Sequence, residues 1–193
     1  MIVNIILLAF LVFMAYWWMS QGLFSGLLHL VAVIVAGSLA LALWEPISLG
    51  LLMKWDKCAP YAWGLGLGIP FVALLLIVRY GFDKLIGKNI NFNPIVSMVG
   101  GAALGLLAGV LTAGLGVISV NYLPVGVAFG GYQPLQIDGN GKISTNPDGD
   151  LWFAVDSAAA GFFSKLSAGA FASDTPLRDF QPDLAGRAAL HRL

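Results

Sequence analysis

Charged residues are scarce in this chain, which has 10 lysines and arginines and 10 aspartates and glutamates among 193 residues. A soluble domain of this size carries about a quarter of its residues as charges, so the composition argues against an ordinary soluble protein. The mean hydropathy is +0.85. The net charge is zero and basic residues do not cluster, which argues against nucleic acid as a partner.

Cysteine is nearly absent, since Cys58 is the only one. A single cysteine excludes an internal disulfide and a metal site built from several thiolates. The sequence also has no recognisable carboxylate pair, nucleophile beside a base, or phosphate-binding loop. We therefore expect no enzymatic activity and no cofactor.

Long charge-free runs are what the sequence has instead, at residues 1–44, 58–78 and 89–137. About 20 apolar residues cross a hydrocarbon core of roughly 30 Å, so the first run must hold two spans, joined at the "SQG" of residues 20–22. The first run has no basic leader and is expected to stay as a span rather than be removed as a signal peptide.

We predict an all-α integral membrane protein whose residues 1–122 form a four-helix transmembrane domain. The expected transmembrane helices lie at roughly 2–20, 24–44, 60–80 and 95–120. An extramembrane tail follows, with a glycine- and proline-rich loop or hairpin at 123–150, an amphipathic interfacial helix at 151–172 and a polar tail at 173–193.

The expected tail helix, "LWFAVDSAAAGFFSKLSAGAFA", has an apolar face that either lies in the membrane interface or docks in a protein groove. Its main apolar residues are Trp152, Val155, Phe162, Phe163 and Leu166, and the polar residues opposite are Asp156, Ser157, Ser164 and Ser167. The polar tail beyond it lacks enough apolar residues to bury a core alone.

The stretch "QIDGNGK" resembles half of a calcium-binding EF-hand loop, with Asp138 and Asn140 as candidate ligands. Gln136 and Pro147 occupy the positions where the strongest carboxylate ligands belong, so calcium is not expected. A hairpin turn built on Asn140 and Gly141 is the favoured interpretation.

Small residues recur at every fourth position of the last span, at Gly101, Gly105, Gly109 and Ala113. Such a stripe lets helix backbones approach closely. In lipid the hydrophobic effect does not drive helices together, so close van der Waals packing stabilises their association instead. We expect packing against the other spans of the same chain, with contact to another chain as the alternative.

Two features inside the spans have a plain and a functional interpretation. Gly64, Gly66, Gly68 and Pro70 predict a helix break that either bends a structural helix or lines a transport path, and the bent structural helix is favoured. His29 is a weak candidate ligand for the metal of a haem or chlorophyll, but a hydrogen bond within the bundle is the expected role.

The opening "NIILLAFLVFMAYWWMSQGLFSGLLHLVAVIVAGSLA" and the segment "FNPIVSMVGGAALGLLAGVLTAGLGVI" resemble the first two spans and the glycine-rich last span of the colicin V production protein family. Asn4 stands where many members have an acidic residue. The resemblance implies a small multi-pass inner-membrane protein, associated with export of a peptide toxin or with envelope maintenance.

Arg79, Lys84 and Lys88 lie on one side of the predicted membrane, and Lys54 and Lys57 lie on the other. The positive-inside rule therefore favours a cytoplasmic loop at 79–93 and both termini in the periplasm.

We expect an accessory or structural subunit that binds the lipid bilayer and other membrane proteins or itself. The alternative is a transporter or pore subunit that uses the break in span three.

Overall fold

The computed structural model describes residues 2–86, 93–124, 132–133, 135–137, 139, 143–146 and 149–168. The predicted polar tail at 173–193 and the candidate calcium ligands Asp138 and Asn140 lie outside these residues. The elements described are α1 (Ile2–Gln21), α2 (Leu23–Gly50), η1 (Leu52–Lys54), η2 (Ala59–Tyr61), α3 (Ala62–Leu85), α4 (Pro94–Asn121), β1 (Leu135–Ile137), β2 (Ile143–Thr145) and α5 (Val155–Ala168).

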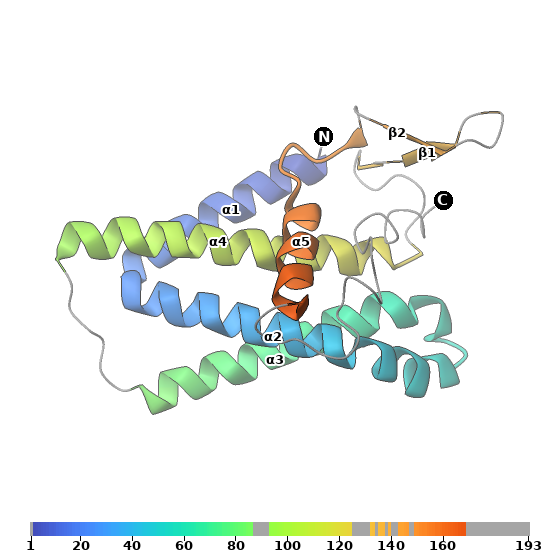
Figure 1. Ribbon diagram of the computed structural model, residues 1–193, viewed down its shortest axis with the longest axis horizontal. Coiled ribbons are helices and arrows are strands. Elements are labelled where there is room, and N and C mark those ends of the chain that lie inside the picture. Colours follow the sequence, from blue (N-terminus) through green and yellow to red (C-terminus); the bar gives the residue numbers. More distant parts are fainter. Residues whose placement is uncertain are drawn as a thin grey trace.

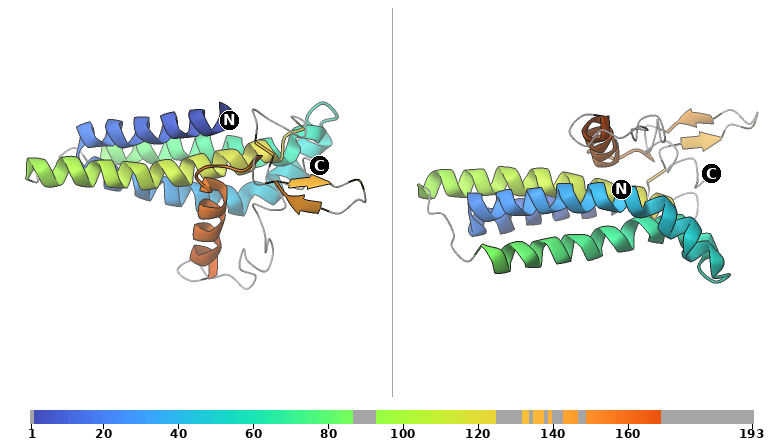
Figure 2. Two further views of the ribbon diagram at one scale, coloured as in Figure 1. Left: turned by 90° about the horizontal axis from the view of Figure 1, so that it is seen from above. Right: turned by 60° about the horizontal axis from the view of Figure 1, so that its bottom comes forward.

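Helices α1 to α4 run along one another as a bundle, and α5 crosses them on one face (Figure 1). Each of the four is long and apolar enough to cross a membrane, which confirms the four predicted spans by length and composition. One end of the bundle holds the α1–α2 turn and the end of α3. The α2–α3 connection and the antiparallel pair β1–β2 lie towards the other end, and α1 begins short of that end (Figure 2).

The turn between α1 and α2 is made by Gly22 alone, as the "SQG" pattern predicts. Gly22 has a φ of 90°, which an L side chain rarely adopts. A Cβ there would also lie 2.6 Å from the Ser97 hydroxyl oxygen. That oxygen accepts a hydrogen bond from the Leu23 N–H at 3.3 Å, so the turn is fastened to the first part of α4.

Helices α2 and α3 extend past their predicted ends at residues 44 and 80, to Gly50 and Leu85. Those ends were set by hydropathy, which limits the part in hydrocarbon but not the helix itself. The last turns of α2 are held to the start of α3 by two side chains: the Trp44 indole donates to the Trp63 carbonyl at 2.8 Å, and, within the extension, the Ser48 hydroxyl donates to the Ala62 carbonyl at 3.1 Å.

The glycine stripe of α4 packs against α1 of the same chain. A Cβ at Gly105 would lie 2.6 Å from Trp18 Cβ and 2.9 Å from the Met14 carbonyl oxygen, and one at Gly109 would lie 3.1 Å from Met14 Cβ. A Cβ at Gly101 would collide with the Trp18 carbonyl oxygen. The stripe therefore packs against α1 of the same chain, and the two helices can come this close because glycine has no side chain.

Helix α3 is continuous through the predicted break at Gly64–Pro70. A Cβ at Gly66 would collide with the Ser48 hydroxyl, and one at Gly68 would lie 2.6 Å from the Ser119 hydroxyl. The Ser119 hydroxyl donates to the Gly64 carbonyl at 2.7 Å. These glycines bring α3 close to α2 and α4, and they do not open the helix.

The interior of the bundle is apolar between α2, α3 and α4. Its fully buried side chains are mostly alanine and branched aliphatic residues, namely Val33, Ala36, Ala40, Leu67, Ala108, Leu115 and Ile118. Small residues on facing helices let the axes approach, and the aliphatic residues fill the remaining space at crystal-like density.

Replacing Gly105 with leucine should lower the free energy of unfolding by about 1–3 kcal/mol, the usual cost of overpacking, because the new side chain must displace Trp18. Gly116→Leu is the matched control on the same helix, since a Cβ at Gly116 meets nothing within 4 Å. Unfolding in detergent micelles, followed by circular dichroism, measures both. Equal stability of the two variants would contradict internal packing of the stripe.

Candidate functional site

Helix α5 docks across the bundle on two glycines, one on α4 and one on α2. At Gly114, an added Cβ would collide with the Val155 carbonyl oxygen and the Ala159 Cβ. At Gly37, it would collide with the ring of Phe163. These contacts bury three residues of α5, namely Val155, Ala159 and Phe163. The tail helix therefore packs these apolar residues against its own chain.

The sequence predicts a tail helix at 151–172, whereas the structure describes a helix at Val155–Ala168, and residues 169–172 lie outside the described residues. Trp152 precedes the helix and is 57% exposed, and Phe162 is 36% exposed. Val155 and Phe163 are buried as expected, and Leu166 is partly buried against the core. Helical periodicity predicts which residues share one face of α5, but it does not show how wide the contact with the bundle is. Because α5 crosses the bundle at an angle, only a narrow strip of that face touches it.

Asp156 was predicted on the polar face of α5 and is instead 8% exposed. Its carboxylate accepts the Tyr132 hydroxyl at 3.0 Å, and Tyr132 accepts the side-chain amide of Asn121 at 3.3 Å. Burial and the Asp156 carboxylate raise the pKa of Tyr132, so its hydroxyl stays protonated and able to donate. Three distant parts of the chain are joined by this Asn121–Tyr132–Asp156 network.

Asn4 of α1 forms a second set of hydrogen bonds between the bundle and the segment before α5. Its side-chain amide donates to the Asp150 carbonyl at 3.3 Å, and its side-chain oxygen accepts the Trp152 N–H at 3.1 Å. Asn4 is 6% exposed. Both polar ends of the amide are therefore satisfied by main chain that enters α5.

The level at which α5 crosses can be placed along α2. Gly37, which contacts Phe163, lies about 21 Å from Leu23 at the helical rise of about 1.5 Å per residue. In a hydrocarbon core of about 30 Å that begins near Leu23, α5 crosses within about 10 Å of the far boundary. In-plane amphipathic helices occupy this depth.

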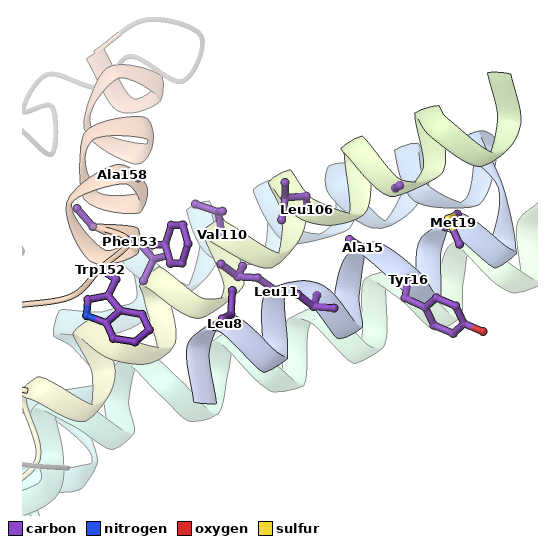
Figure 3. Close-up of a pocket in the computed structure, with 14 residues that line it drawn as sticks. Leu8, Leu11, Ala15, Tyr16, Met19, Leu106, Val110, Trp152, Phe153 and Ala158 are labelled. Carbon is purple, nitrogen blue, oxygen red and sulfur yellow. The ribbon is translucent and has the colours of Figure 1, made fainter. Parts of the chain in front are cut away.

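An apolar groove of about 820 Å³ lies beneath the start of α5, between α1 and α4 (Figure 3). Trp152, Phe153 and Ala158 close one end, and Tyr16 and Met19 lie at the other. The rest of its lining comes from the outward sides of α1 and α4 and the entry into α5, at Leu8, Leu11, Val12, Ala15, Ala102, Leu106, Val110, Ala154 and Val155. The groove was not visible in the sequence, because α5 closes it from far along the chain.

The opposite half of the bundle holds a cluster around Trp18. The His29 ring stacks on the indole with centroids 4.3 Å apart, and the Arg79 guanidinium carbon lies 5.1 Å from the indole centroid. Arg79 also pairs with Asp83 at 2.8 Å. Neither ring nitrogen of His29 has a hydrogen-bond partner among the described residues, so its predicted hydrogen bond within the bundle is not seen there.

Replacing Tyr132 with phenylalanine should weaken docking of α5 by about 1–3 kcal/mol, because Asp156 and Asn121 each lose a partner while buried. The measurement is the rate of proteolysis within residues 149–168 under native conditions, which should rise with the population of the undocked helix. Tyr61→Phe, at a 44% exposed tyrosine, is the control. A cleavage rate equal to that of the unmodified chain would exclude this role of Tyr132.

Comparison with protein-family models, with curated proteins and with solved structures found no match to this chain. Its likeness to colicin V production proteins therefore rests on the sequence patterns described above, and its function is inferred from the residues themselves.

Proposed function

We propose that this chain is a non-catalytic accessory or structural subunit of a bacterial inner-membrane assembly. By its resemblance to colicin V production proteins, that assembly serves toxin export or envelope maintenance. The four apolar helices fit a multi-pass membrane protein. Periplasmic termini remain our proposal, based on the distribution of lysine and arginine.

Within the part of the chain that the structure describes, the surface that we assign to a partner is the α2–α3 tip, which we define as residues 51–61. The stripe of α4 is occupied within the chain, and so are Val155, Ala159 and Phe163 of α5. Leu43 lies about 30 Å along α2 from Leu23, which is the thickness of the hydrocarbon core, so residues 51–61 come after the point where α2 reaches the far boundary. The tip nevertheless exposes large apolar side chains, at Leu51, Met53, Trp55 and Tyr61.

Apolar side chains exposed beyond the hydrocarbon core favour contact with a protein, and this observation carries the proposal. Lys54, Asp56 and Lys57 lie among them and are also exposed, which gives the tip the mixed character of a non-obligate interface. Trp55 is 65% exposed and is the natural anchor.

The alternative of a transporter or pore subunit depends on an opening at Gly64–Pro70. Those glycines face Ser48 and Ser119 at close range, and the interior beside them is filled by apolar side chains. Transport paths are lined by several polar or ionisable groups near the bilayer midplane. The side chains that join one helix to another here, such as Ser48 and Ser119, lie towards one end of the bundle. Near the middle of α4 the Thr112 hydroxyl is buried without a partner among the described residues. The geometry at Gly64–Pro70 therefore supports a structural subunit better than a transporter or pore subunit.

The test is purification through an affinity tag in mild detergent, with mass spectrometry of the proteins recovered and of their ratios. We expect a stoichiometric membrane-protein partner that is lost with Trp55→Ala and kept with Trp17→Ala, a matched change at an exposed tryptophan near the other end. Recovery of the chain alone, together with ion flux in reconstituted vesicles that Pro70→Ala abolishes, would instead establish the pore alternative.

A further inference from the structure

The shape of the groove between α1 and α4 restricts what can occupy it. On α1 it extends from Leu8 to Met19, which is roughly 16 Å at the helical rise. Half of a 30 Å hydrocarbon core is about 15 Å, so the groove has the length of one leaflet. It runs along the bundle axis, which is the direction of lipid chains when the four helices span the bilayer (Figure 3).

The groove is closed at one end by the underside of α5. Phe153, Val155 and Ala158 line that end, and Trp152 lies beside them. A transmembrane helix of a partner or of a second copy must cross the whole core, so it cannot pass this obstruction. The groove surface is also much smaller than the roughly 800 Å² per partner that a stable protein interface buries.

The open end lies near the α1–α2 turn, where Met19 and the exposed Tyr16 are found. The Tyr16 hydroxyl points away from the groove, as expected for a tyrosine that reaches towards the headgroup layer (Figure 3). The remaining lining is almost wholly apolar, which suits a hydrocarbon chain and no charged ligand.

We propose that the groove is a binding site for one acyl chain of a phospholipid from the leaflet on the side of the α1–α2 turn. The chain enters between Tyr16 and Met19, lies against Leu8, Val12 and Leu106, and ends at the underside of α5. Helix α5 thereby sets the greatest chain length that fits. This site does not depend on the partner proposed for the α2–α3 tip.

Native mass spectrometry of the full chain, released from detergent after incubation with dipalmitoyl- or dilauroyl-phosphatidylethanolamine, tests the site. The unmodified chain should retain one dipalmitoyl lipid that detergent exchanges slowly. Leu106→Trp should lower this retention about tenfold by filling the groove. Leu107→Trp is the matched control, since Leu107 is the next residue, is 55% exposed and does not line the groove.

A second variant tests the closed end. Ala158→Trp enlarges the obstruction and should shift the preference from the dipalmitoyl to the dilauroyl lipid, whereas Leu106→Trp should lower retention of both. Equal retention by the Leu106 and Leu107 variants would overturn the site. A dimer that dissociates with Leu106→Trp would overturn it as well, since the occupant would then be a second copy.

Discussion

The close approach of backbones at glycine is the constraint on which this structure depends. Lipid chains are as apolar as leucine, so burying apolar side chains between membrane helices brings little gain, and contact distance decides the packing. Helix α1 is held to α4 where Gly105 admits Trp18, and α3 is held to α2 where Gly66 admits Ser48. The docking of α5 follows the same rule at Gly37 and Gly114.

Polar side chains then fix the positions that glycine permits. Ser48 and Ser119 bond to main-chain carbonyls of α3, and Asn4 and Asp156 secure the segment around α5. Each of these bonds lies in the half of the bundle that carries α5. The other half holds Arg79 with Asp83, beside the stacked Trp18 and His29. The middle consists mostly of small and aliphatic residues, with the buried hydroxyl of Thr112 among them.

The four spans and the turn at Gly22 could be predicted from the sequence, because charge-free length and a single glycine are local signals. The extension of α2 could not, because a residue such as Glu45 marks the edge of the hydrocarbon but does not end a helix. The buried state of Asp156 depends on Tyr132, which is 24 positions away, and periodicity within α5 does not contain that information. The groove likewise exists only once residues 152–158 lie over α1 and α4.

The account requires α5 to lie in the plane of the membrane, just inside its boundary. A nitroxide at Gly161→Cys in a Cys58→Ser chain measures this depth, since Gly161 is exposed and a Cβ there meets nothing within 4 Å. Oxygen and nickel accessibilities should place this label between one at Val72→Cys in the hydrocarbon and one at Lys54→Cys outside it. A label at Gly161 as accessible to nickel as the one at Lys54 would put α5 in water and contradict the account.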